Sequence, residues 1–304
     1  MSVELLVVGA GPAGVSAALW AKALELDVLL LDGADVPGGQ LHSVHFHPQD
    51  VPGFEQGDGP ALAAAYARQL AAASVPLRTA SPAESLDAGE GRSPRVTLRG
   101  GEVLEARAVL VASGVRRRRL EVPGEREFEG RGVSFSATRD RDQLAGRTVV
   151  IAGGGDAAFE NALLLAQAGS RVTLVVRGEP RARAEFRSRA SAAGIPVLEH
   201  TRVLEVTGDT RARAMRVAGP EGERVLEAEG FVVKVGVVPN SEGCRGPVRC
   251  DADGYVVADE HLATSAPAVW AAGDITRPKP PSIPVAIGQG AQAIAMIRAA
   301  LRGR

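Results

Sequence analysis

The run LLVVGAGPAGVSAALWAKALELDVLLLD, residues 5–32, decides the fold of the first part of the chain. An apolar segment at residues 3–8 ends in GAGPAG, a helical pattern with Val15 and Leu19 on one face follows, and a second apolar segment ends at Asp32. This order predicts a strand, a glycine turn, a helix and a second strand. It is the opening unit of a Rossmann-like α/β domain.

The three glycines of the turn have the spacing G-x-G-x-x-G. Gly9 is expected to form the turn, Gly11 to let the backbone approach a pyrophosphate, and Gly14 to let the helix pack against the strand. The amino end of the helix then offers N–H groups to an anion. Asp32, at the end of the second strand, is placed to bind a ribose hydroxyl. The turn therefore predicts a dinucleotide site.

A second copy of this unit begins at TVVIAGGG, residues 148–155. Its turn reads G-x-G-x-x-A, with Gly153, Gly155 and Ala158, and the next strand ends at Arg177 instead of at an acid. An arginine at that position suits a 2′-phosphate, which favours NADPH over NADH. Arg181 and Arg183 support this prediction, although the same basic residues are also compatible with a solvated helix start.

The unit built twice predicts two domains. A hairpin is expected at residues 95–106, a buried strand at 108–114, a meander at 213–230 and a strand at 231–239. We expect a discontinuous first domain at 1–115 and 243–304, and an inserted domain at 116–242. Each is expected to be a three-layer ββα Rossmann-like domain.

Bulk properties exclude several classes of protein. The 304 residues carry a formal charge of −1, so nothing indicates binding to nucleic acid. No apolar run is long enough for a membrane span and the first residues do not resemble a signal peptide, so the expected location is the cytoplasm. Cys244 and Cys250 are the only cysteines, and their spacing matches no common zinc or redox motif.

WAAGD, residues 270–274, indicates a flavin site rather than a plain nicotinamide site. Small residues let the backbone lie close to a ribityl chain, and Asp274 can accept hydrogen bonds from its hydroxyls. The amino end of the helix expected from about Val285 would offset negative charge on a reduced flavin ring.

These motifs, together with GGQL, VPGF, ASG, RRLEVPGE, GRGVSFSATRD and GVVPN in this order, resemble the low-molecular-weight thioredoxin reductase family. The resemblance covers nearly the whole chain and implies a homodimer with FAD in the discontinuous domain and NADPH in the inserted one. For FAD it implies contacts from Gly9, Gly11, Pro12, Ala13, Gly14, Asp32, Gly39, Gln40, Leu41, Ser113, Gly114, Gly273, Asp274, Ser282 and Ile283. For NADPH it implies contacts from Gly153, Gly155, Asp156, Ala157, Ala158, Arg177, Arg181 and Arg183.

One departure from the family concerns its redox disulfide. Where the family has C-A-T-C-D, this chain has Ser136, Ala137, Thr138, Arg139 and Asp140. A dithiol relay needs an attacking thiolate and a resolving thiol, so disulfide reduction by the family mechanism is excluded. Asp140 keeps the position of the family's acid. Arg139 could approach the flavin and favour its anionic reduced form.

Other departures leave alternatives open. Pro281 and Ser282 replace the family's Arg-Gln pair before the last helix. His42, His45 and His47 replace a threonine-rich loop, and we consider a proton donor (His45 or His47), a metal site and plain surface residues. Cys244 and Cys250 are either a displaced redox pair or ordinary cysteines.

The run of arginines at residues 116–119 is either a solvated face or a docking site for an acidic electron-transfer protein. The leading hypothesis is an FAD-dependent NAD(P)H oxidoreductase that passes electrons directly to an external acceptor, as a ferredoxin or flavodoxin reductase does. The alternatives are a flavin-binding redox sensor or scaffold that does not turn over, and a disulfide reductase that uses Cys244 and Cys250 or a dithiol of its substrate.

Overall fold

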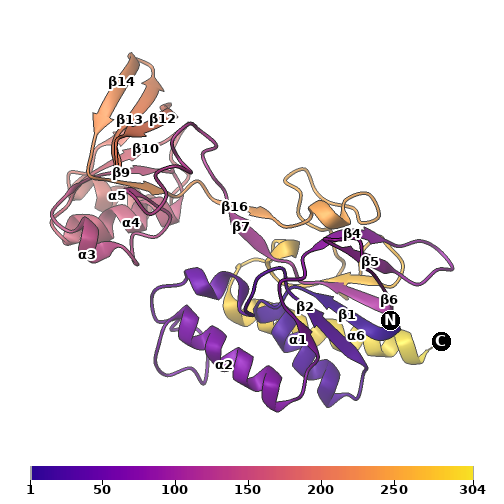
Figure 1. Ribbon diagram of the computed structural model, residues 1–304. Coiled ribbons are helices and arrows are strands. Elements are labelled where there is room, and N and C mark those ends of the chain that lie inside the picture. The colour runs from indigo at the N-terminus through magenta and orange to yellow at the C-terminus, as the bar shows by residue number, and fades with distance from the viewer. Residues whose placement is uncertain (1, 304) are drawn as a thin grey trace. The chain divides into compact units, whose positions relative to one another are not determined.

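The computed structural model describes residues 2–303, which form two compact units (Figure 1). The first unit combines the chain up to Arg116 with the chain from Val238 onward, and the second is Arg117–Val237. The return to the first unit comes at Val238 rather than at the expected 243. The reason is local, because the N–H of Asn240 already donates to the carbonyl oxygen of Gly114 at 3.0 Å.

The first unit is built on a sheet in which the described residues contribute seven strands. Its order is β3-β2-β1-β6-β5-β4, and β17 also pairs with β6. The strands β1, β2, β3 and β17 run parallel to their neighbours, whereas β4 and β5 are antiparallel to theirs. Their bounds are Ser2–Val8 (β1), Val28–Leu31 (β2), Leu77–Arg78 (β3), Ala83–Asp87 (β4), Arg95–Leu98 (β5), Val103–Val111 (β6) and Val269–Ala271 (β17).

Three helices cover one face of this sheet: α1 (Pro12–Ala23), α2 (Gly59–Ala72) and α6 (Ile283–Arg302) (Figure 1). Alternate residues of β1 divide between the faces: Leu5 and Val7 join the core under the helices, and Leu6 joins the core on the other side. Helices α1 and α6 approach closely, since a Cβ on Gly290 would lie 2.2 Å from the carbonyl oxygen of Ala13.

Strand β6 corrects one sequence prediction. The expected hairpin strand and the expected buried strand after it are one continuous strand, because residues 103–111 contain no glycine or proline that would end it. Its first half pairs antiparallel with β5, and its second half lies parallel to β1 and β17. The hairpin turn at Gly100 and Gly101 is present, and both have positive φ.

The second unit contains a parallel sheet of order β11-β10-β9-β15-β8 and an antiparallel sheet of order β12-β13-β14. Helix α4 (Asp156–Gln167) packs its Phe159, Ala162 and Leu163 into the core. The other elements are β8 (Val133–Ser134), α3 (Arg141–Leu144), β9 (Thr148–Ala152), β10 (Arg171–Val175), α5 (Ala184–Ala192), β11 (Val197–Leu198), β12 (Arg202–Gly208), β13 (Ala212–Gly219), β14 (Gly222–Glu227) and β15 (Gly230–Val233).

The expected strand at 231–239 is interrupted. β15 ends at Val233, and a second strand, β16 (Val237–Pro239), begins after Gly236, whose φ of +96° turns the chain. β16 pairs with β7 (Val115–Arg117), so the two chain crossings between the units lie side by side. The predicted α/β class, with a parallel sheet in each half, is confirmed.

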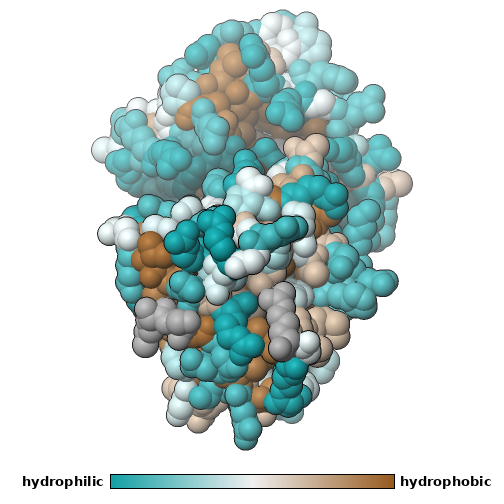
Figure 2. All heavy atoms as spheres, turned by 90° about the vertical axis from the view of Figure 1, so that its right-hand side faces the viewer, coloured by the Kyte–Doolittle hydropathy of each residue, from teal (hydrophilic) through white to brown (hydrophobic). Residues whose placement is uncertain are grey.

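The buried apolar cores, rather than ion pairs on the surface, stabilise the folded state. Hydrophilic residues cover most of the face shown in Figure 2, and apolar residues occur there in separate groups. Many charged side chains form exposed ion pairs such as Arg95 with Asp87 and Arg99 with Glu84, and such solvent-screened pairs contribute little to stability. No helix within residues 2–303 has the length and apolar character needed to cross a bilayer.

Candidate functional site

A cavity of about 730 Å³ opens in the first unit at the carboxyl ends of β1, β2, β6 and β17. This is the edge at which open α/β sheets bind ligands, and the volume is typical of a cofactor site. Nearly all residues predicted for FAD line it: Gly9, Gly11, Pro12, Ala13, Asp32, Gly39, Gln40, Leu41, Ser113, Gly114, Gly273, Asp274, Ser282 and Ile283. Gly14 does not, because its Cα faces the strand: a Cβ there would lie 1.8 Å from the carbonyl oxygen of Gly9.

The glycine turn after β1 has the geometry of an anion cradle. Gly9 has φ of +108°, and a Cβ on it would lie 2.4 Å from the carbonyl oxygen of Ala112. A Cβ on Gly11 would meet nothing within 4 Å, so that glycine leaves space at the cavity wall. Helix α1 begins there without a side-chain cap, so its first N–H groups can bind a diphosphate.

Asp32 is oriented by the backbone at the end of β2. Its carboxylate accepts hydrogen bonds from the N–H of Ala10 at 2.6 Å and of Ala34 at 2.8 Å. These two bonds fix the side chain at the cavity wall, where it can accept from ribose hydroxyls. Asp32 therefore lies at the cavity wall, and its role in ribose binding stays a prediction.

The far end of the cavity is formed by the segment after β17. Gly273 has φ of +81°, and its N–H donates to Oε1 of Gln289 on α6 at 2.7 Å. Burial raises the pKa of the Asp274 carboxyl above its ordinary value. A buried carboxylate without a donor is unfavourable, and the hydroxyls of a ribityl chain would supply donors. Helix α6 starts at Ile283, two residues before the expected start, because Ser282 caps it by accepting from the N–H of Val285.

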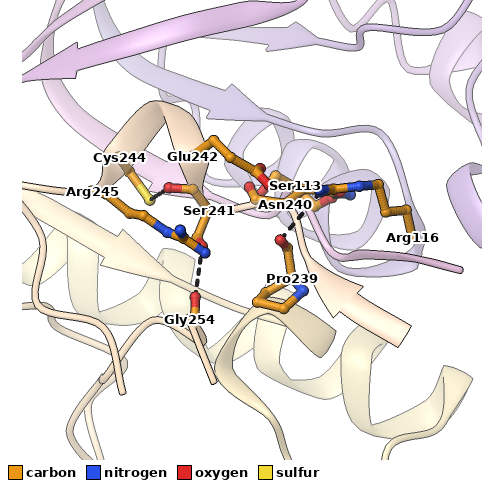
Figure 3. Close-up of polar contacts among 9 residues, drawn as sticks. All are labelled: Ser113, Arg116, Pro239, Asn240, Ser241, Glu242, Cys244, Arg245 and Gly254. Atoms are coloured by element: carbon orange, nitrogen blue, oxygen red, sulfur yellow. Dashed lines mark hydrogen bonds and ion pairs between the residues drawn. The ribbon is translucent and has the colours of Figure 1, made fainter. Parts of the chain in front are cut away.

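Figure 3 shows a polar network in the cavity wall that sequence reasoning missed. Nη1 of Arg116 donates to Oδ1 of Asn240 at 2.9 Å, and its Nη2 donates to Glu242 at 2.7 Å. Asn240 also exchanges hydrogen bonds with Ser113, and all four residues line the cavity. The sequence marks one member of the network, because Asn240 ends the GVVPN motif directly after β16, but it does not show which residues Asn240 contacts.

The donor set fits FAD. It combines an open helix terminus for the diphosphate, a carboxylate for the ribose, a half-buried carboxyl for the ribityl chain and a second helix terminus beyond it. The first turn of α1 carries no acidic residue, so the helix terminus itself places no negative charge against a diphosphate.

A second glycine turn lies in the other unit, between β9 and α4. Gly153 has φ of +147°, whereas a Cβ on Gly155 would meet nothing within 4 Å, as at Gly11. Helix α4 again starts without a side-chain cap. Asp156, one of the predicted contacts, forms an ion pair with Arg183 at 2.8 Å.

The predicted 2′-phosphate residues stand on the β10 side of this turn. Arg177 and Arg181 are exposed, and no ion pair holds either of them within residues 2–303. The N–H groups of Arg181 and Ala182 donate to the carbonyl oxygen of Gly154, which fixes the loop against the turn. Arg183, held by Asp156, is less available to a phosphate than the sequence suggested.

The segment in place of the family disulfide is held by local hydrogen bonds. Nε and Nη2 of Arg139 donate to the two carboxylate oxygens of Asp140 at 2.7 and 2.9 Å. Asp140 also accepts from the hydroxyl of Ser134, and the N–H of Arg139 donates to Oγ of Ser136. Asp140 therefore has a structural role here, and Arg139 is engaged within its own unit.

The two cysteines pack in the same core of the first unit and are not part of the cavity lining, although the lining includes Gly243, the residue before Cys244. Cys244 is buried and its thiol donates to the carbonyl oxygen of Ser241 at 3.3 Å (Figure 3). Burial raises the pKa of Cys244 to about 11, and burial also raises the pKa of Cys250. Both thiols are therefore protonated at neutral pH, which makes them weak nucleophiles.

The histidines do not reach the cavity. A ring nitrogen of His42 lies 2.9 Å from the carbonyl oxygen of Pro37, and His47 makes the same kind of contact with Gly57 while its ring stacks on Phe54. Neither these two nor His45 lines the cavity wall. Within residues 2–303, no group of three or more possible ligands could hold a metal ion.

The arginine run does not form one solvated face. Arg116 is bound to Asn240 and Glu242, and Arg119 pairs with Glu129 at 2.6 Å while stacking over Phe135. Arg117 is half-buried, and burial lowers its pKa. Arg118 is exposed, and its side chain takes part in none of these contacts.

Comparisons with known proteins agree with this geometry. Residues 3–290 match the pyridine nucleotide-disulphide oxidoreductase family. A thioredoxin reductase from Listeria monocytogenes is 30% identical over 292 residues, 94% of this chain and 90% of that protein. An NADH dehydrogenase from Bacillus subtilis is 31% identical over 297 residues, 95% of this chain and 57% of that protein. The crystal structure of Lactococcus lactis thioredoxin reductase superposes with a TM-score of 0.84 at 27% identity, covering 99% of this chain and 100% of that one.

Proposed function

The chain belongs to the pyridine nucleotide-disulphide oxidoreductase family, and we propose that it carries electrons from NADPH, by way of bound FAD, to an external acceptor without a disulfide of its own. The observation that carries this proposal is the segment at residues 134–140. Ser136 and Arg139 stand where the family has its two thiols, and Arg139 is bound to Asp140. The thioredoxin reductase mechanism therefore has no thiol to use here.

The protein's own contribution is binding and orientation. When bound, FAD accepts hydride from the dinucleotide and can release electrons singly or in pairs. The open N–H groups at the start of α1 would hold its diphosphate, and Asp32 would hold its ribose through a carboxylate fixed by Ala10 and Ala34. Asp274 would accept hydrogen bonds from the ribityl hydroxyls. The network around Arg116 closes the wall of the same cavity.

NADPH is the proposed donor rather than NADH. The support is the pair Arg177 and Arg181, two exposed guanidinium groups at the position where an NADH site has a carboxylate. Binding of both dinucleotides, measured with and without the substitution Arg177→Ala, tests this choice. Tighter wild-type binding of NADH than of NADPH would contradict this choice, and an NADPH preference that survives the substitution would show that Arg177 does not cause it.

The proposed acceptor is a small acidic electron-transfer protein of the ferredoxin or flavodoxin type, and the protein is proposed to act as a homodimer. The support for the acceptor is the lack of a protein dithiol together with the basic surface at Arg118. With three of the four arginines engaged, the docking surface is smaller than the sequence suggested.

Anaerobic mixing of the yellow holoenzyme with NADPH tests the function. Rapid bleaching of the flavin is expected, followed by reoxidation when the acceptor is added. A screen of ferredoxin, flavodoxin, quinones, oxygen and thioredoxin then identifies the acceptor. Persistent yellow colour would instead support a sensor without turnover, and reduction of thioredoxin would contradict the proposal.

A further inference from the structure

Lys234 lies beside the second glycine turn, at a position that the sequence reasoning passed over. It follows β15 directly, and its N–H donates to the carbonyl oxygen of Ala152, the last residue of β9, at 2.7 Å. A Cβ on Gly153 would lie 2.2 Å from the carbonyl oxygen of Lys234. The lysine backbone therefore touches the turn that receives the dinucleotide.

Strand order shows which half of the dinucleotide meets this lysine. β10 and β15 flank β9 on opposite sides, so the crevice between β9 and β15 is the point at which the strand order reverses. Arg177, which follows β10, marks the adenosine side. A dinucleotide whose diphosphate lies on the turn after β9 then extends its nicotinamide half over β15, toward Lys234.

The charge of Lys234 has little compensation. Its ammonium donates to the carbonyl oxygen of Phe135, the residue before Ser136, at 2.9 Å, and no ion pair holds it within the described residues. Arg117 on β7 faces it with a like charge, and Arg139 is a further cation beside Arg117. Glu160 on α4 is the acid that acts on it, from a distance.

We propose that Lys234 binds at the nicotinamide end of the dinucleotide and favours the reduced form over the oxidised form. This inference rests on the proposed function. The oxidised nicotinamide ring carries a positive charge and the reduced ring carries none, so a fixed cation nearby repels only the oxidised ring. The expected effect on the affinity ratio is roughly five-fold, as for two unit charges about 8 Å apart in a half-solvated site. Release of the spent dinucleotide is favoured as a result.

The preference has a defined pH dependence. Burial, and secondly Arg117, lower the pKa of Lys234 to about 8, while Glu160 opposes this shift. The ammonium is therefore present below that pH and is lost above it. Arg117 and Arg139 keep their charge throughout this range.

Calorimetric titration of the oxidised holoenzyme with NADP⁺ and with tetrahydro-NADPH, an analogue whose reduced ring is uncharged and cannot donate hydride, tests the proposal. The ratio of the two dissociation constants is measured from about pH 6.5 to about pH 9.5, on either side of the lysine pKa of about 8. Both ligands carry the same phosphates, so phosphate titration cancels in the ratio. The wild-type preference for the reduced analogue is expected to fall about five-fold across this range.

Three variants separate the possible causes. Lys234→Met should show, at every pH, the ratio of dissociation constants that wild type shows at high pH. Lys234→Arg should show, at every pH, the ratio that wild type shows at low pH. Lys22→Met is the matched control: the chain has three lysines, and Lys22 is exposed on α1, so its loss should leave the wild-type profile unchanged.

Two results would overturn the inference. If Lys234→Met weakens both ligands by the same factor, the lysine acts on the diphosphate and does not sense the ring. If the ratio is the same in wild type, Lys234→Met and Lys234→Arg, the lysine has no part in binding. Failure of the proposed function looks different, because the wild-type protein would then bind neither ligand at any pH.

Discussion

Ser113 and Asn240 hold each other by two hydrogen bonds although 127 positions separate them in the sequence. Oγ of Ser113 donates to the carbonyl oxygen of Asn240 at 2.7 Å, and Nδ2 of Asn240 donates to the carbonyl oxygen of Ser113 at 2.8 Å. The segment that leaves the first unit and the segment that returns to it are thereby joined at the wall of the flavin cavity.

Asn240→Ala should weaken both this joint and FAD retention. The substitution leaves the carbonyl oxygen of Ser113 without its donor, which costs about 1–3 kcal/mol. It also removes one acceptor of Arg116, whose guanidinium stays bound to Glu242. The temperature at which flavin is released, followed by its fluorescence, should fall. Asn240→Asp keeps the acceptor for Arg116 and should lose less. An unchanged release temperature in the alanine variant would contradict the proposed role of the joint.

Gly9→Ala and Gly11→Ala should fail in different ways. A Cβ at Gly9 would collide with the backbone of Ala112 at a strained φ, so this variant should be destabilised as well as flavin-free. A Cβ at Gly11 would meet no protein atom within 4 Å, so that variant should fold normally. It should nevertheless bind FAD more weakly than wild type, because the methyl group occupies the space of the diphosphate. Circular dichroism with flavin titration separates the two. Normal FAD affinity in Gly11→Ala would exclude this position for the diphosphate.

Asp274→Asn should stabilise the flavin-free protein near neutral pH and weaken its binding of FAD. Burial raises the folded-state pKa of Asp274 above the ordinary 3.8. The stability gained from its protonated form is therefore present at low pH and lost as the pH rises through the folded-state pKa. Denaturation should be measured from low to neutral pH. As the pH rises, the free energy of unfolding of wild type should fall relative to that of the variant. A constant difference between the two proteins at all pH values would refute this account.

Replacing both cysteines should leave turnover intact. Burial raises the pKa of Cys244 to about 11 and also raises the pKa of Cys250. Neither thiol is therefore an effective nucleophile toward a disulfide at neutral pH. The variant Cys244→Ala with Cys250→Ser should oxidise NADPH with ferricyanide at the wild-type rate. Alkylation of the native thiols should be slow compared with the unfolded chain. Lost turnover would revive the disulfide alternative.

Much of the fold could be predicted because its main elements carry local signals. The turns at Gly9 and Gly153 need positive φ, and the sequence marks them by spacing alone. The break after Val233 was missed because an apolar run reads as one strand, and the single Gly236 that turns the chain is a weak signal within it.

The site was predicted where one segment supplies its own geometry, as in the glycine turn with Asp32. It was missed where contacts join distant segments, as for Arg116 with Glu242, because no local pattern records a partner 126 positions away. The arginine run illustrates the same limit. Four identical neighbours suggested one surface, but an extended chain directs alternate side chains to opposite sides.

The backbone hydrogen bond between Asn240 and Gly114 also bears on how the two-unit chain evolved and on how it can be re-engineered. Because the N–H of Asn240 reaches the carbonyl oxygen of Gly114 at 3.0 Å, a few linking residues would suffice to close the first unit without the second. The inserted unit can then be exchanged as one contiguous segment of the gene. The same flavin-binding unit would in this way receive electrons from a different donor.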